Sequence, residues 1–183
     1  MENRERITLL KSETVLPRDE LIQLIASYDE SDREYAATLA REVSLKVFGN
    51  KIYFRGLIEL TNYCRNDCYY CGIRRGNSNV QRYRLTEDEV IFCCDYGYKI
   101  GFRTFVLQGG EDEYFTDERV VSLVSRMKEK YPDCALTLSL GEKSRKSYQM
   151  FYDAGANRYL LRHETATESH YAKMHPAELS LAN

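Results

Sequence analysis

Between residues 57 and 174 the sequence alternates short apolar runs with longer amphipathic stretches, and this alternation constrains the fold most strongly. The apolar runs have the length and composition of buried strands, and the stretches between them have helical periodicity. The expected strands cover residues 57–60, 103–108, 135–140 and 158–162. The expected helices cover residues 86–100, 116–130, 143–154 and 167–174. Strands and helices that alternate at this spacing predict an α/β fold with a parallel sheet and helices outside it.

The first fifty residues predict two helices that precede the sheet. One follows Pro17, because proline favours the first turn of a helix. The other begins with the capping-box pattern Ser31-x-x-Glu34. We therefore expect an N-terminal helical extension over residues 1–50 and a sheet-bearing domain over residues 51–183.

The number of strand–helix units bears on the architecture of that domain. Four units are too few to close an eight-stranded (β/α) barrel. Only one short helix is expected after the strand at residues 158–162. We therefore expect about four units of a TIM-type barrel, which would be the N-terminal half of a longer structure.

The charge balance argues against nucleic acid and membrane partners. The chain has 26 Lys and Arg residues against 28 Asp and Glu residues, a formal net charge of −2, so no strong field would attract nucleic acid or anionic lipid. Its start, MENRERITLLKSET, lacks the apolar core of a secretory signal. No stretch approaches the roughly 18 apolar residues of a membrane span. We expect a soluble cytoplasmic protein.

A polar segment follows each expected strand, at the end where parallel α/β folds gather their reactive groups. These segments are TNYCRNDCYYCGIRR at 61–75, QGGED at 108–112, TLSLGE at 137–142 and RHET at 162–165. All four are rich in residues that bind ligands or shape loops. Because the four segments share one edge of the sheet, they predict a single shared site.

Three of the six cysteines lie on the first of these segments, with the spacing Cys64-x3-Cys68-x2-Cys71. In a reducing cytosol such cysteines are metal ligands or buried thiols rather than disulfides. Three thiolates on one tight loop suit soft metals and iron–sulfur clusters. A 4Fe-4S cluster held by three cysteines keeps one iron free to bind a substrate.

The other three cysteines, Cys93, Cys94 and Cys134, lie outside this spacing. The first two fall within an expected helix, and the third comes just before an expected strand. Free cysteine commonly behaves as a small apolar residue in protein cores. We interpret all three as buried core residues.

Two other uses of the cysteine loop stay open on the residues alone. A closed zinc site has four ligands, and one of the three histidines of the chain can supply the fourth, although no second CxxC motif follows. A thioredoxin-like redox pair would use Cys68 and Cys71. That interpretation gives Cys64 no role, and no helix begins cleanly at the loop.

The CxxxCxxC motif after the first strand resembles the signature of radical S-adenosylmethionine (SAM) enzymes. This resemblance implies that Cys64, Cys68 and Cys71 hold a 4Fe-4S cluster, whose free iron is chelated by the amino and carboxylate groups of SAM. One electron from the cluster then cleaves SAM to methionine and a 5′-deoxyadenosyl radical.

Two further motifs are similar to those of the same family. Tyr70, just before the third cysteine, occupies the aromatic position that lies by the adenine in this family, although ordinary packing under the loop also explains it. Gly109-Gly110-Glu111 resembles the GGE-type motif that aligns the SAM amino group through backbone oxygens. Glycines at these positions also permit close backbone approach.

Longer stretches are similar to the biotin-synthase-like branch of the family. Within that branch they most resemble the radical SAM maturases of iron-only (FeFe) hydrogenases, the HydE type. The stretches are RGLIELTNYCRNDCYYCGIRR, YRLT, VLQGGED, TLSLGE and RYLLRHETA, within residues 50–183. The resemblance therefore covers almost all of the expected barrel portion.

The narrower resemblance implies roles for five more residues. Thr137, Ser139 and Glu164 would contact SAM through its methionine and ribose parts. Arg162 would help to set the site, and Arg55 would face the substrate cavity. The alternatives are that Thr137 and Ser139 are small strand residues. Arg162 and Glu164 can instead form an ion pair at the end of the sheet.

The resemblance implies an enzyme that cleaves SAM reductively and takes part in assembling the di-iron cofactor of FeFe hydrogenase. The implied partners are SAM, a small-molecule substrate, an electron donor such as a ferredoxin or flavodoxin, and other hydrogenase maturation proteins. One alternative is another biotin-synthase-like activity, such as sulfur insertion or a methylornithine-type rearrangement. The other is a non-catalytic iron–sulfur or zinc protein.

Overall fold

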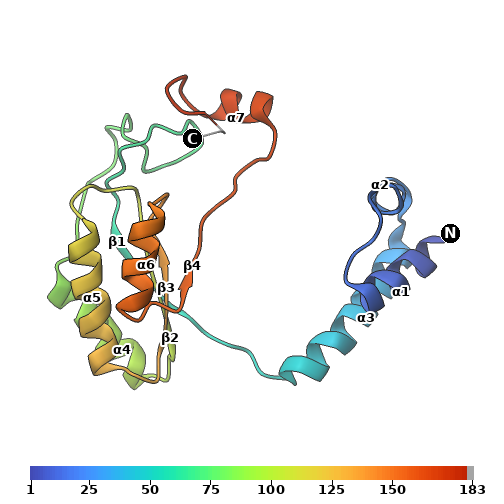
Figure 1. Cartoon of the computed structure of the whole chain (residues 1–183), viewed down its shortest axis with the longest axis horizontal. Coiled ribbons are helices and arrows are strands. Elements are labelled where there is room, and N and C mark those ends of the chain that lie inside the picture. Colours follow the sequence, from blue (N-terminus) through green and yellow to red (C-terminus); the bar gives the residue numbers. More distant parts are fainter. Residues whose placement is uncertain (181–183) are drawn as a thin grey trace. The chain divides into compact units, whose positions relative to one another are not determined.

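A computed structural model of the chain describes residues 1–180, which pack as two units. The first unit comprises Met1–Tyr53, and the second begins at Phe54. Figure 1 shows helices alone in the first unit and a sheet with helices in the second. Within residues 1–180, no helix is both long and apolar enough to cross a membrane.

The first unit contains three helices, where the sequence predicted two. They are α1 (Asn3–Glu13), α2 (Arg18–Ser27) and α3 (Glu30–Phe48). The prediction missed α1 because only one of its side chains, Ile7, is buried, so it has no apolar stripe. Its start is fixed instead by a capping box in which the Glu2 and Glu5 side chains satisfy each other's backbone N–H groups.

Helix α3 starts earlier than its predicted capping box. The residue that caps it is Asp29, whose side chain accepts a hydrogen bond from the backbone N–H of Asp32. The Asp32 side chain in turn accepts a hydrogen bond from the Asp29 N–H. The capping box therefore begins two residues before Ser31. Aspartate at both positions also suits the positive end of the helix dipole.

The second unit is built on a four-stranded parallel sheet, which confirms the predicted α/β fold. Its strands are β1 (Gly56–Thr61), β2 (Thr104–Gly109), β3 (Ala135–Ser139) and β4 (Arg158–Tyr159). They lie in the order β1-β2-β3-β4, so each strand pairs with the next one along the chain. The carboxyl ends of all four strands therefore meet at one edge of the sheet.

The fourth strand is shorter than predicted. It ends at Tyr159, whereas the sequence predicted a strand through Arg162. One more backbone bond, from the Leu160 N–H to the Leu138 carbonyl, continues the pairing at 2.8 Å. Beyond it the chain leaves the sheet because β3 itself ends at Ser139, so no further partner is available.

Three helices cover one face of the sheet, as Figure 1 shows. They are α4 (Glu87–Lys99), α5 (Asp117–Lys130) and α6 (Arg145–Asp153). Their apolar sides form one core with alternate strand residues, among them Leu60, Leu107 and Leu138, which are all fully buried. A last helix, α7 (Glu168–Met174), follows β4.

The prediction that all three remaining cysteines are buried was wrong for Cys93. Cys94 and Cys134 are buried, but Cys93 is exposed. Consecutive residues of an α-helix point about 100° apart, so only one of two adjacent cysteines on α4 can face the sheet.

Candidate functional site

The three cysteines lie on a long loop that follows β1 and runs through residues 62–83, here called the cysteine loop. The Arg82 side chain links distant parts of this loop. Its guanidinium donates to the carbonyls of Asn62, Ile73, Arg74 and Asn77. A planar group with five donors can hold several carbonyls at once, which fixes a segment that has no helix or strand of its own.

The three thiols are half-buried and influence one another. Burial raises the pKa of the Cys68 thiol, and the neighbouring Cys64 and Cys71 thiols raise it further. Across residues 1–180, no three His, Cys, Asp or Glu side chains converge on a point for a single metal ion. A 4Fe-4S cluster needs no such convergence, because each cysteine binds a different iron.

Gly110 brings the loop after β2 directly against the cysteine loop. A Cβ atom at this position would lie 2.8 Å from Cys64 Cβ and would overlap the Tyr63 carbonyl oxygen. At Gly109 a Cβ would come within 2.9 Å of Thr61 Cγ2. Both predicted glycines therefore permit a backbone contact that any other residue would obstruct.

Glu111 ties three of the predicted loops together. Its carboxylate pairs with Arg65 of the cysteine loop at 2.8 Å, and its carbonyl accepts from the Arg65 backbone N–H at 2.9 Å. The Glu111 side chain also packs where Gly141 has no side chain, in the loop after β3. Gly141 has φ 77°, a left-handed conformation that suits glycine.

Asp112 is a buried carboxylate that the sequence did not single out. It accepts hydrogen bonds from Thr61 Oγ1 at 2.8 Å and from two guanidinium nitrogens of Arg84. Burial opposes its ionisation, but the bonds from Arg84, Thr61 and the Tyr114 N–H outweigh burial and lower the pKa of Asp112. The charged group thus fixes the loop after β2 to the end of β1.

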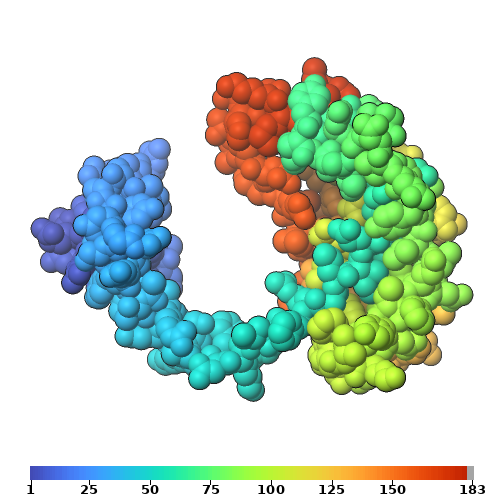
Figure 2. All heavy atoms as spheres, turned by 180° about the vertical axis from the view of Figure 1, so that it is seen from behind, coloured from blue at the N-terminus to red at the C-terminus, as the bar shows by residue number. Residues whose placement is uncertain are grey.

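Tyr70 lies on the cysteine loop with about half of its side chain exposed. Its hydroxyl is 3.2 Å from Nε2 of His175, a buried residue directly after α7. Burial raises the pKa of the Tyr70 hydroxyl, and the charges of Cys68 and Glu164 add to this. Figure 2 shows the red segment that carries α7 against the cyan and green atoms of the cysteine loop.

Thr137 and Ser139 lie on the face of the sheet opposite the helices, because their neighbours Leu136 and Leu138 belong to the helix-side core. Both are buried. Thr137 Oγ1 is the buried side-chain oxygen or nitrogen within residues 1–180 that has no hydrogen-bond partner. A buried hydroxyl without a partner costs free energy, so it can gain from a polar ligand.

On the same face, Ser139 continues a polar row across the sheet. It pairs in register with Gln108, which pairs with Glu59. The Gln108 amide donates to the Glu59 carboxylate at 3.2 Å. Glu59 could not be recognised from the sequence, because a single polar residue in a short apolar strand is common.

The remaining predicted residues are exposed. Arg162 and Glu164 follow β4, and Glu164 has φ 39°, which is rare for a residue with a side chain. Arg55 precedes β1, at the opposite end of that strand from the cysteine loop. A six-residue strand separates them, so Arg55 lies about 20 Å from the loop.

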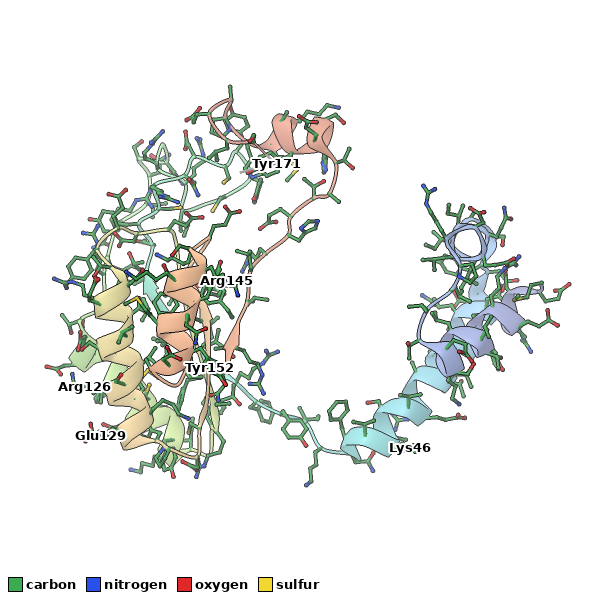
Figure 3. All side chains as sticks on the ribbon, viewed as in Figure 1. Lys46, Arg126, Glu129, Arg145, Tyr152 and Tyr171 are labelled. Atoms are coloured by element: carbon green, nitrogen blue, oxygen red, sulfur yellow. The ribbon has the colours of Figure 1, made fainter. Side chains whose placement is uncertain are left out.

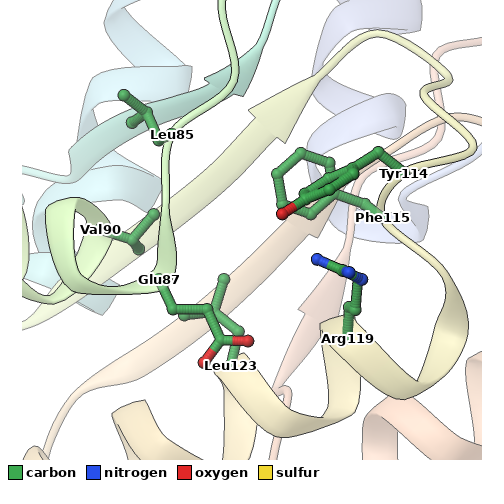
Figure 4. Close-up of a pocket in the computed structure, with 7 residues that line it drawn as sticks. All are labelled: Leu85, Glu87, Val90, Tyr114, Phe115, Arg119 and Leu123. Atoms are coloured by element: carbon green, nitrogen blue, oxygen red, sulfur yellow. The ribbon is translucent and has the colours of Figure 1, made fainter.

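A separate small pocket lies between α5, the loop before it and the start of α4 (Figure 4). Its volume is about 20 Å³, roughly the space of one water molecule. The Arg119 guanidinium stands 4.1 Å from the centre of the Tyr114 ring at its rim. The pocket is far too small for SAM and lies on the helix side of the sheet.

Comparison with known proteins agrees with this arrangement. The sequence profile of the radical SAM superfamily matches residues 58–180, which contain the whole sheet except its first two residues. The chain belongs to the radical SAM superfamily. Members of this family are enzymes that use a 4Fe-4S cluster and SAM. Such clusters take thiolate donors, and the cysteine loop of this chain carries three half-buried thiols.

Among the relatives of this radical SAM chain is the [FeFe] hydrogenase maturase subunit HydE of Thermotoga maritima, with 39% identity over 159 residues. The 3-methylornithine synthase of Methanosarcina acetivorans is 30% identical over 161 residues. Each alignment covers 87% of this chain and 45% of the relative. Biotin synthases also match. The biotin synthase of Cutibacterium acnes is 26% identical, and the alignment covers 90% of this chain and 47% of that enzyme. The chain thus spans about half the length of the curated relatives it matches.

Solved structures agree on the fold. A crystal structure of methylornithine synthase (PylB) superimposes with a TM-score of 0.82 and 26% identity, over 99% of this chain and 52% of that one. The maturase HydG superimposes with a TM-score of 0.84 over 95% of this chain and 40% of that one. The sheet of this radical SAM chain is therefore part of a TIM-type barrel.

Proposed function

We propose that Cys64, Cys68 and Cys71 ligate the 4Fe-4S cluster of this radical SAM chain. The observation that carries the proposal is the position of all three half-buried thiols on one braced loop at the carboxyl end of β1. Gly110 of the next loop packs directly against Cys64. When bound, such a cluster supplies the electron that cleaves SAM.

We further propose that SAM binds at this edge of the sheet. Thr137 supports this assignment, because its buried hydroxyl is without a partner and would gain one from a polar part of SAM. Ser139 lies two residues further along the same face. Gly109 and Gly110 lie at the same edge and bring the loop after β2 against the cysteine loop. The half-exposed Tyr70 ring offers a surface for adenine.

Charged residues would complete the SAM site. Both the carboxylate and the carbonyl of Glu111 are bonded to Arg65, so we propose that Glu111 serves the SAM site by holding the cysteine loop in place. Glu164 and Arg162 are both exposed, and we propose that they bind the charged and hydroxyl groups of SAM. The left-handed backbone of Glu164 supports a functional role, because such conformations cluster at ligand sites. Arg55, at the far end of β1, would meet the substrate rather than SAM.

The reaction that we propose is a step in assembly of the di-iron cofactor of FeFe hydrogenase. The 39% identity to a HydE protein over 87% of this chain supports it. A methylornithine-type rearrangement is the second candidate, supported by 30% identity to a 3-methylornithine synthase and by the superposition with PylB. In either reaction the residues of this chain would bind SAM, exclude water and fix its orientation.

The ligation is tested by single substitutions and iron analysis after anaerobic reconstitution. Cys64→Ala, Cys68→Ala and Cys71→Ala should each abolish the cluster, whereas Cys93→Ala and Cys134→Ala should keep about four irons per chain. Cys93 is the matched control because it is exposed. Zinc in place of iron in anaerobically purified protein would contradict the proposal.

The reaction is tested separately, in a reconstituted hydrogenase maturation mixture that lacks HydE. Addition of the chain should restore hydrogen evolution if it acts as a maturase. Formation of methylornithine by the reduced, SAM-supplied chain would support the second candidate instead. If the chain cleaves SAM but gives neither outcome, both proposed reactions are contradicted. The chain would then be known only to carry out the SAM cleavage that is common to its family.

A further inference from the structure

The segment after β4 returns to the cysteine loop and docks on it. The backbone N–H of Tyr69 donates to the Met174 carbonyl at 2.9 Å, at the end of α7. Farther along, the Glu178 carboxylate lies 3.7 Å from the Arg75 guanidinium. The contacts join residues about 105 positions apart, so α7 is held to the loop that carries the three thiols.

His175 is the side chain at the centre of this contact. It is 4% exposed, and its ring stacks on Tyr171 of α7 with centroids 3.8 Å apart and an angle of 14°. Tyr171 is labelled in Figure 3. Nδ1 of His175 lies 3.0 Å from the Tyr171 carbonyl oxygen. These contacts leave the ring little freedom to rotate.

The hydrogen-bond partners determine which nitrogen of His175 carries the proton. A carbonyl oxygen only accepts, so Nδ1 must be the donor to Tyr171. In a neutral imidazole, Nε2 is then an acceptor. The group 3.2 Å from Nε2 is the Tyr70 hydroxyl, which therefore donates to His175. The Tyr70 ring also meets the His175 ring edge to face, at 5.4 Å and 85°.

Tyr70 is thus held at its hydroxyl and half exposed. Its hydroxyl is anchored, while the side chain stays 49% exposed, so a planar ligand can reach the ring. Tyr70 is separated by one residue from Cys68 and immediately precedes Cys71, both proposed cluster ligands. A ring that is fixed before the ligand arrives loses less conformational freedom on binding.

We propose that His175 is a positioning residue that fixes the Tyr70 ring for the adenine of SAM, which makes the end of α7 part of the SAM site. This inference rests on the proposed function, in which SAM binds beside the cysteine loop. It differs from a purely structural role, in which His175 only fastens α7 and leaves SAM affinity unchanged.

Two substitutions of His175 separate these roles. In His175→Asn, the side-chain amide can still donate to the Tyr171 carbonyl but is too short to reach Tyr70. In His175→Gln, the longer amide places an acceptor near the position of Nε2. The third variant is Tyr70→Phe, which keeps the ring and removes the hydroxyl. Because Tyr70 is half exposed, this variant tests the same bond without disturbing a buried residue.

The measurement is the SAM dissociation constant of the anaerobically reconstituted chain. It is obtained from the SAM-dependent change in the paramagnetic resonance spectrum of the reduced cluster. Iron content and thermal unfolding are recorded for each variant. Loss of one hydrogen bond predicts affinity about 5–10-fold weaker for His175→Asn and for Tyr70→Phe. His175→Gln should bind within about twofold of the unchanged chain. The double variant His175→Asn/Tyr70→Phe should be no weaker than either single variant, because both remove the same bond.

Three results would overturn the inference. They are unchanged affinity in cluster-loaded Tyr70→Phe, equal loss in the Gln and Asn variants, and multiplied losses in the double variant. If the unchanged chain binds iron and SAM while the variants show one of these patterns, the inference alone fails. If the unchanged chain takes up no cluster or shows no SAM response, the proposed function fails and this inference fails with it.

Discussion

Arg84 and Asp112 form a two-point ion pair, with Arg84 Nε 2.7 Å from Asp112 Oδ2 and Arg84 Nη2 2.9 Å from Oδ1. The Asp112 side chain is 3% exposed and the Arg84 side chain 38%. The pair joins the segment that leads into α4 to the loop after β2, and Thr61 at the end of β1 adds a third contact. The nearly buried Asp112 carboxylate therefore stabilises the edge of the sheet that carries the candidate site.

Asp112→Asn should lower the free energy of unfolding by about 1–3 kcal/mol at neutral pH, because it removes charge-assisted bonds to a buried group. Urea unfolding followed by circular dichroism measures this. The matched control is Glu113→Gln, since Glu113 is the exposed neighbouring carboxylate and should change stability little. Equal effects of the two substitutions would contradict the bracing role.

The same pair predicts how stability depends on pH. The pKa of Asp112 is lower in the folded chain than its ordinary value of about 3.9. Its stabilisation is therefore fully present above about pH 5 and is lost as the pH falls through the lowered folded-state pKa. The stability difference between the unchanged chain and Asp112→Asn should shrink below about pH 4 and stay constant above about pH 5. A difference independent of pH would contradict this.

Gly110→Ala should displace the cysteine loop, because the added Cβ would overlap the Tyr63 carbonyl and approach Cys64 Cβ to 2.8 Å. We expect a loss of about 1–3 kcal/mol in unfolding free energy and fewer irons per chain. Gly72→Ala is the control, since a Cβ at Gly72 has nothing within 4 Å although it follows Cys71 directly. Full iron content in Gly110→Ala would show that the contact does not matter for the cluster.

Arg82→Lys should weaken retention of the cluster. Lysine keeps the charge, but its single ammonium cannot hold the four carbonyls that the Arg82 guanidinium reaches. Arg75→Lys is the control, because Arg75 lies on the same loop and, among residues 1–180, its side chain makes only an exposed ion pair at 3.7 Å. Iron loss over time in the presence of a chelator should be faster in Arg82→Lys alone. Equal rates of iron loss in the two variants would contradict this role of Arg82.

Much of the fold could be predicted because it follows from local patterns. The sequence predicted a helix from residue 86, and α4 is capped there, with Thr86 and Glu89 forming a capping box. The parallel order of the strands follows from their alternation with helices. The miss at α1 has the opposite cause, since that helix has a single buried residue and no apolar periodicity to detect.

The candidate site also has a part that local sequence patterns predict and a part that they do not. The spacing of Cys64, Cys68 and Cys71 is local, so it is visible in the sequence. The contacts that brace and complete the site join distant residues, such as Tyr70 with His175 and Thr61 with Asp112. No local pattern specifies such pairs, because they depend on which loops the folded sheet brings to one edge.

Thr137→Val separates a SAM contact from a structural role. The Thr137 hydroxyl is buried without a partner, so its removal should leave the unfolding free energy unchanged or raise it by up to about 1 kcal/mol. If the hydroxyl meets SAM, the dissociation constant should rise about 5–10-fold while the iron content stays the same. Unchanged SAM affinity would make Thr137 a strand residue without a role in binding.

If Cys64, Cys68 and Cys71 hold a cluster as proposed, one of its irons is open to SAM. Paramagnetic resonance of the reduced, anaerobically reconstituted chain, recorded with and without SAM, distinguishes an open iron from a closed cluster. We predict the spectrum of a 4Fe-4S cluster at about four irons per chain, with a clear change when SAM is added. A cluster whose spectrum is identical with and without saturating SAM, or a chain that takes up no iron, would contradict the account.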